Sequence, residues 1–118
     1  FQYDTRRNQV TNRRLMANWV TIDTPDPNAG QASTASQGRT KGAARFARLE
    51  GIWYGNGSIY FVATSGGNNG AGQIWEFRPV SNDPVNGYGY LTLVYESPSP
   101  QVLQRPDNIV VTPRGGFI

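Results

Sequence analysis

Residues 50–64 read EGIWYGNGSIYFVAT, and this stretch decides the fold. Asn56-Gly57 supplies the positive φ angles that a type I′ turn requires, so it predicts a tight hairpin. The residues on both sides of this turn are rich in aromatic and β-branched types, which favour strands. The stretch therefore predicts two antiparallel strands joined by a short turn.

Two further strands are predicted downstream. In residues 72–78, Ile74 and Glu76 alternate with Trp75 and Phe77. This run ends at Pro79, because proline is not tolerated in the interior of a sheet. Residues 90–96 read YLTLVYE and precede two prolines. Residues 44–97 thus predict a four-stranded antiparallel meander of about 50 residues, the size of one propeller blade.

A partial repeat follows this blade. At an offset of 57 residues, EGIWY (50–54) lines up with DNIVV (107–111), and residues 60–61 line up with 117–118. We therefore expect an all-β chain that holds one blade and the start of the next. A blade buries its faces only against its neighbours, so the rest of its own propeller or partner chains should be needed for stability.

Residues 1–42 predict an irregular N-terminal arm, and residues 43–118 predict the partial β-propeller. Within the arm, the apolar stretch 15–22 fits either a strand or a short helix, and residues 24–42 have loop composition. The chain begins with Phe1 and ends in an apolar run. We expect it to be a piece of a longer protein.

The amino-acid composition excludes several kinds of catalytic and metal site. The chain has 118 residues, with 14 Gly, 8 Pro, no Cys and no His. It cannot by itself form a Cys/His zinc site, a Ser-His-Asp triad or a disulfide. The sequence holds no apolar run long enough for a membrane span.

The basic residues are concentrated near the N-terminus. Residues 1–48 hold eight of the eleven Lys and Arg, within a net charge of +3. These arginines are not interleaved with stacking aromatics, which favours a solvated basic face over a nucleic-acid partner.

Two acids mark the candidate site. In a propeller the innermost strands line the channel, so Glu50 and Asp107 would face one another across it. Carboxylates brought together repel unless a cation neutralises them, and hard cations such as calcium prefer oxygen ligands. The alternative is that each acid caps a turn. Arg48 lies two residues from Glu50 on the same strand face, where it would bind a phosphate or carboxylate, or else form a salt bridge with Glu50.

Several segments in order resemble the PhoX-type alkaline phosphatase family. They are FARLEGIWY (46–54), IYF (59–61), TSGG (64–67), GQIWE (72–76), LTLVYESP (91–98) and PDNIVVTPRGG (106–116). The resemblance implies a six-bladed β-propeller that is exported by the twin-arginine route and hydrolyses phosphomonoesters with calcium and iron. It implies a periplasmic or secreted protein whose substrate is a phosphate ester.

By this resemblance, Glu50 is a metal ligand and Arg48 a catalytic phosphate binder, while Asp107 and Asn108 lie near the metals. The acidic, cysteine-containing segment that follows in the family is absent, so this piece should be inactive alone. The alternative function is a non-catalytic propeller that serves as a binding or structural module in a larger extracellular assembly. A third possibility is an independent, carbohydrate-binding β-sandwich.

Overall fold

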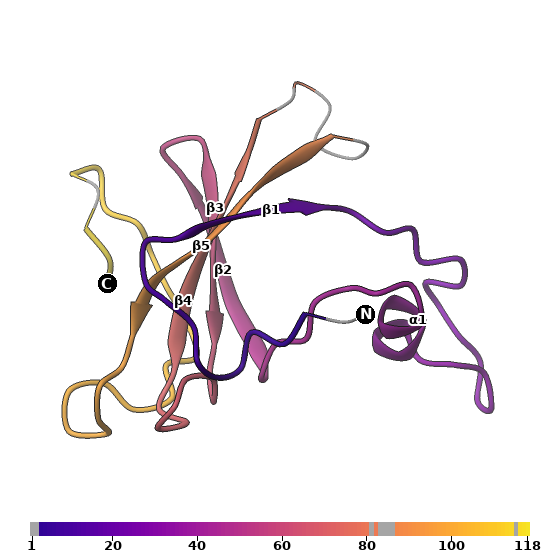
Figure 1. Ribbon diagram of the computed structural model, residues 1–118, viewed down its shortest axis with the longest axis horizontal. Helices are drawn as coiled ribbons and strands as arrows, with labels where there is room; N and C mark the ends of the chain where they lie inside the picture. The colour runs from indigo at the N-terminus through magenta and orange to yellow at the C-terminus, as the bar shows by residue number, and fades with distance from the viewer. Residues whose placement is uncertain (1–2, 81, 83–86, 115) are drawn as a thin grey trace.

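One antiparallel sheet dominates the computed structural model, which describes residues 3–80, 82, 87–114 and 116–118 (Figure 1). The strands lie in the order β1-β5-β4-β3-β2, so every neighbouring pair except β1 and β5 is also consecutive in sequence. The elements are β1 (Arg14–Asn18), α1 (Thr34–Thr40), β2 (Leu49–Gly55), β3 (Ser58–Ala63), β4 (Gln73–Pro79) and β5 (Tyr88–Glu96).

The predicted four-stranded meander is confirmed. Strands β2 to β5 pair in sequence order, and every pair is antiparallel. At the β2–β3 turn, Asn56 and Gly57 have φ angles of 53° and 77°, the two positive values that the Asn-Gly pair predicts. An all-β chain is therefore confirmed, while its place in a propeller stays a prediction because the sheet does not close among the described residues.

Strand β1 comes from the segment that was expected to be irregular. It pairs with β5, with Leu15 opposite Leu91. Leu15 and Ala17 pack against the core, whereas the alternate residues of the strand are exposed. The strand reading of residues 15–22 is thus correct for its first part, because β5 offers a free edge to which an alternating segment can add.

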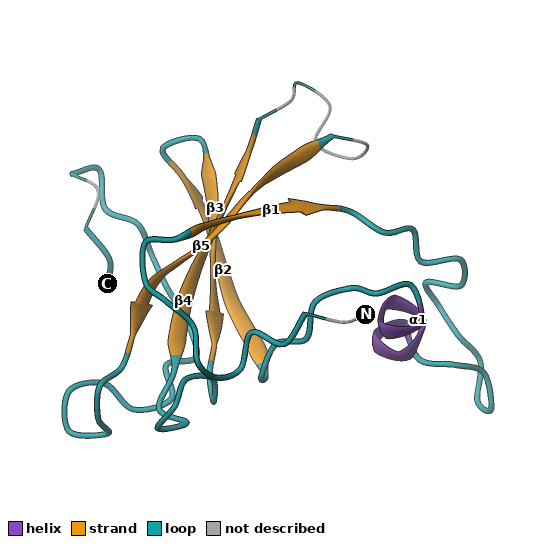
Figure 2. Ribbon diagram, viewed as in Figure 1, coloured by secondary structure: helices purple, strands orange, loops and turns teal. Residues whose placement is uncertain are grey.

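Helix α1 also lies in the predicted arm, where the composition indicated a loop. Ser33 caps it by accepting a hydrogen bond from the Ser36 amide at 3.1 Å. The Gln37 side chain bonds both the amide and the carbonyl of Thr24, at 2.9 and 2.8 Å. Capping and these tertiary bonds, rather than intrinsic propensity, stabilise this short helix. Figure 2 shows it set to one side of the strands.

The two faces of the sheet carry separate apolar clusters. On one face, Trp75 is buried among alanine and leucine residues, and the Phe46 ring meets it edge to face at 5.6 Å. On the other face, Ile109 packs against Val62 and Ile74. Segments outside the sheet therefore cover both faces, one from the N-terminal side and one from the C-terminal side.

The aligned second repeat forms only a minimal hairpin. Val111 pairs with Phe117, and the backbones of Val110 and Ile118 exchange two hydrogen bonds at 3.0 and 2.9 Å. In the first hairpin Tyr60 pairs with Trp53, whereas Phe117 pairs with Val111, which aligns with the residue after Trp53. The second hairpin thus differs in register by one residue.

Gln73 connects the N-terminal segment to the sheet. Its buried amide nitrogen donates to the Thr5 carbonyl at 3.1 Å and to Glu96 Oε1 at 3.0 Å. Its amide oxygen accepts a bond from the Trp75 indole at 3.2 Å. One side chain thus satisfies polar groups from three segments inside the core.

Replacing Gln73 with leucine should lower the free energy of unfolding by at least about 2 kcal/mol, since each orphaned buried polar group costs about 1–3 kcal/mol. Urea unfolding followed by tryptophan fluorescence measures this change. Gln104→Leu is the control, because Gln104 is exposed. Equal unfolding midpoints for the two variants would show that the Gln73 bonds contribute little.

Strand β2 is an edge strand with unusual exposure. Four of its large apolar side chains lie 43–71% exposed: Leu49, Ile52, Trp53 and Tyr54. Such a continuous apolar edge is typical of a surface that packs against further protein.

Among the described residues, no helix is long and apolar enough to cross a membrane.

Candidate functional site

A β-bulge lies at the start of β2, at two residues of the predicted site motif. Leu49 pairs with Ala63 and Ile52 pairs with Phe61, so Glu50 and Gly51 share one opposing position on β3. The Gly51 amide donates instead to the Asp107 carbonyl at 2.7 Å. Bulges of this kind redirect side chains next to functional sites.

This contact brings the two halves of the predicted site together. Thr64 Oγ1 donates to the Pro106 carbonyl at 2.8 Å, which fixes the segment that precedes Asp107. A Cβ atom on Gly51 would lie 2.5 Å from the Asn108 Cα. Real Cβ atoms essentially never come this close to backbone, so residues 107 and 108 reach β2 only because residue 51 is glycine.

Arg48 lies beside Glu50 in a strained backbone conformation. Its φ angle is 55°, which costs a residue with a Cβ about 1–2 kcal/mol. Its carbonyl accepts a hydrogen bond from the Thr64 amide at 2.9 Å, which holds it there. Its Nη2 atom lies 3.6 Å from Glu50 Oε1, and the two side chains are 61% and 43% exposed.

Arg48 and Glu50 form the salt bridge that was the alternative role for Arg48, but the bridge is weak. An exposed pair at this distance contributes about 0–1 kcal/mol, because solvent screens it. The guanidinium therefore keeps most of its capacity to bind an oxyanion through two parallel hydrogen bonds. Salt bridge and oxyanion binder are compatible roles for Arg48.

Asn108 and Asp107 differ in their surroundings. Asn108 Oδ1 accepts a bond from the Ile109 amide at 2.9 Å, and Ile109 is buried under the sheet. Asp107 is exposed, and its carboxylate forms no hydrogen bond or ion pair with another described residue. Asn108 thus shapes the backbone, while Asp107 offers free oxygen atoms.

The residues present fit part of a calcium site. Glu50 and Asp107 supply carboxylate oxygens from neighbouring segments, and an amide oxygen such as that of Asn108 is also a calcium ligand. Calcium takes about six to eight oxygen ligands. The described part of the chain contains no group of three or more His, Cys, Asp or Glu residues placed to hold a metal. The described residues thus place oxygen donors on adjoining segments without an assembled metal site.

The glycine-rich loop between β3 and β4 is not a phosphate cradle. Its amides bond to backbone carbonyls: Gly66 to Ala63, Gly70 to Gly67, and Gly72 to Gly66. A phosphate cradle needs amides that point at the ligand. The loop is thus structural, as its position between two strands indicates.

Sequence reasoning did not assign a role to Gly51. A lone glycine inside a strand pattern signals a bulge or a close backbone approach, and here it marks both. The positive φ of Arg48 has no such signal, because arginine carries no preference for that conformation.

The fold and this cluster define an all-β protein with an exposed arginine and two carboxylates at adjoining segments. The family described as alkaline phosphatase PhoX matches residues 5–118, and the chain belongs to this family. The match includes most of the segment that was expected to be a separate arm. Searches of curated proteins and of solved structures give no significant match.

Proposed function

We propose that the chain forms part of the active site of a metal-dependent phosphomonoesterase that acts outside the cytoplasm. The bond between the Gly51 amide and the Asp107 carbonyl carries this proposal, because it joins the two acidic segments beside Arg48. Membership of the phosphatase family supports hydrolysis of a phosphate ester.

Each residue has a proposed role. Arg48 binds the phosphate oxygens and offsets the charge that develops in the transition state. Glu50 and Asp107 hold a cation, with the Asn108 amide oxygen beside them. A bound calcium or iron ion polarises the phosphoryl group when present. The chain has neither His nor Cys, so its own contribution to an iron site would consist of oxygen ligands.

The sheet is proposed to be one blade of a propeller. The exposed side chains of Ile52, Trp53 and Tyr54 on β2 support this, because a blade buries its faces against neighbouring blades or partner chains. A periplasmic or secreted location goes with the proposed family function.

Replacing Glu50 with glutamine should lower kcat by at least about 100-fold in the complete protein supplied with calcium and iron. The change keeps the shape of the side chain but removes the negative charge that binds a cation. Hydrolysis of 4-nitrophenyl phosphate measures activity, and elemental analysis measures bound metal. Arg48→Gln should keep the metal and lose activity by about 10²–10³-fold, the usual effect of removing one charge-stabilising donor.

Asp26→Asn and Arg13→Gln are the matched controls, because both positions are exposed and far from the site in sequence. Both controls should keep full activity. A Glu50→Gln protein with unchanged metal content and unchanged kcat would overturn the assignment of Glu50.

The non-catalytic module remains the second candidate. The exposed Arg48 side chain is compatible with it, because a guanidinium can bind an oxyanion without any turnover. Phosphate binding without any turnover by the metal-loaded protein would support this alternative over the phosphatase.

A further inference from the structure

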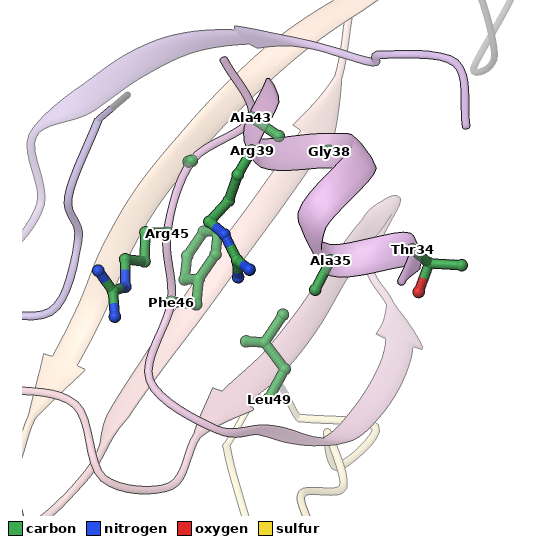
Figure 3. Close-up of a pocket in the computed structure, with 9 residues that line it drawn as sticks. Thr34, Ala35, Gly38, Arg39, Ala43, Arg45, Phe46 and Leu49 are labelled. Carbon is green, nitrogen blue, oxygen red and sulfur yellow. The ribbon is translucent and has the colours of Figure 1, made fainter. Parts of the chain in front are cut away.

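A pocket lies between α1 and the segment that leads into β2 (Figure 3). Its volume is about 520 Å³, within the range of about 300–1,000 Å³ that small-molecule sites occupy. The residues that line it are Thr34, Ala35, Gly38, Arg39, Ala43, Ala44, Arg45, Phe46 and Leu49.

The charge of this pocket is positive only. Arg39 contributes its guanidinium group, Arg45 is also a lining residue, and none of the lining residues is acidic. Neither arginine side chain forms an ion pair or a hydrogen bond with another described residue. Figure 3 shows Arg39 reaching from α1 toward Phe46, with Arg45 on the neighbouring segment. A pocket whose own charged residues are all positive favours an anionic ligand.

Asp4, whose backbone pairs with that of Arg45, has its carboxylate bound to another arginine. The backbones of Asp4 and Arg45 pair with each other, but the Asp4 carboxylate accepts bonds from the Arg6 side chain at 2.9 and 2.7 Å. These hydrogen bonds hold the pKa of Asp4 well below its usual range, so the carboxylate stays ionised and bound to Arg6. The charge of Arg45 also contributes to this lowering of the pKa, so Arg39 is the main cation of the pocket.

One side of the pocket is apolar and fixed. The Phe46 ring contacts the Phe61 and Trp75 rings edge to face, at 5.3 and 5.6 Å between centroids. Leu49 is 53% exposed, so part of its side chain has no protein cover. A fixed aromatic ring beside an exposed leucine suits the apolar part of a ligand.

The opposite wall is held in place by bonds that do not involve the pocket. Lys41, at the end of α1, donates to the Thr21 carbonyl at 2.6 Å and lies 2.8 Å from Asp23 Oδ2. Gln37 ties the middle of the helix to Thr24. The pocket is thus formed before any ligand binds, which limits the entropy lost on binding.

We infer that this pocket binds a small organic anion with an apolar or aromatic group. The carboxylate or phosphate end meets Arg39, with Arg45 adding to the positive field, and the apolar group lies against Phe46 and Leu49. This site is separate from Arg48 and Glu50, and its ligand need not be the phosphatase substrate.

Isothermal titration of the complete protein tests the inference with four probes: phenylphosphonate, benzoate, inorganic phosphate and benzyl alcohol. The two aromatic anions should bind at least about tenfold more tightly than phosphate or benzyl alcohol. Only these two probes contact both the arginines and the apolar wall of the pocket. Tighter binding of benzoate would assign a carboxylate ligand, and tighter binding of phenylphosphonate would assign a phosphate.

Three substitutions then locate the binding. Arg39→Gln should weaken benzoate about tenfold and Arg45→Gln about threefold, because a charge-assisted bond is lost in the first and only a nearby charge in the second. Leu49→Ser should weaken both aromatic anions. Arg13→Gln, at an exposed position outside the pocket, should change nothing, and circular dichroism checks that each variant is folded.

Two results would overturn the inference. One is equal binding of benzoate and benzyl alcohol, which would remove the need for an anion. The other is binding that Arg48→Gln abolishes and Arg39→Gln leaves intact, which would move the ligand to the proposed phosphatase site.

Discussion

Replacing Gly51 with alanine should disable the proposed phosphatase without touching any of its chemical groups. The added Cβ would lie 2.5 Å from the Asn108 Cα and 2.7 Å from the Asp107 carbonyl oxygen, so the segment that carries Asp107 must move. A displacement of about 1 Å in a reacting group can cost about 100-fold in rate, and we expect a loss of kcat of that size. Overpacking of this kind also costs about 1–3 kcal/mol of stability.

Gly55→Ala is the matched control for this prediction. It lies on the same strand, but its Cβ would meet only the Val111 side chain, at 3.1 Å. A contact of 3.1 Å needs a shift of only a few tenths of an ångström at Val111, away from Asp107 and Asn108, so activity should stay within about threefold and stability within about 1 kcal/mol. Activity is measured with 4-nitrophenyl phosphate and stability by urea unfolding. If both variants keep full activity, the close approach at Gly51 does not position the site.

Replacing Trp75 with alanine should produce the largest loss of stability in the chain. Trp75 is completely buried, packs between Phe46 and leucines of β5, and donates its indole N–H to Gln73. Truncating a buried tryptophan typically costs about 3–5 kcal/mol, and here the amide oxygen of Gln73 also loses its partner. Because small domains have a net stability of about 5–15 kcal/mol, this loss is a large part of the total.

Trp19→Ala tests whether the loss at Trp75 comes from burial. Trp19 is 55% exposed and touches Phe77 with one edge, so the same truncation should cost about 1 kcal/mol or less. Thermal unfolding followed by circular dichroism gives both values. Similar losses for the two variants would show that Trp75 does not organise the core.

The meander was predictable because its signals are local. Asn56-Gly57 predicts a turn because both residues readily adopt positive φ angles. The β-branched and aromatic residues of the run 58–64 predict a strand. These signals act within a few residues and agree with each other. The same agreement explains why the strands that end at Pro79 and before Pro98 were also expected.

The elements that the sequence left open or missed depend on partners distant in sequence. Residues 15–22 fit either a strand or a short helix by composition, and the edge that β5 offers makes their first part a strand, β1. Residues 24–42 have loop composition, and α1 forms there because Ser33 caps it and Gln37 bonds to Thr24.

For the site, sequence reasoning named Arg48, Glu50, Asp107 and Asn108. It did not anticipate the bulge at Glu50 and Gly51, nor the bond from Gly51 to Asp107, because both depend on how a segment more than fifty residues away crosses β2. The positive φ of Arg48 is likewise imposed by its neighbours, through the bond from Thr64 to its carbonyl.

The open edge of β2 has a practical consequence for handling the protein. Edge strands in stable proteins are usually blunted by lysine, proline, a bulge or a covering loop; the bulge at Glu50 and Gly51 interrupts only the start of β2, and residues 52–55 contain no charge and no proline. Unpaired backbone groups beside exposed isoleucine, tryptophan and tyrosine form a template on which a second molecule can add its own strand. Preparations in which this edge is uncovered will therefore tend to self-associate and aggregate as concentration rises.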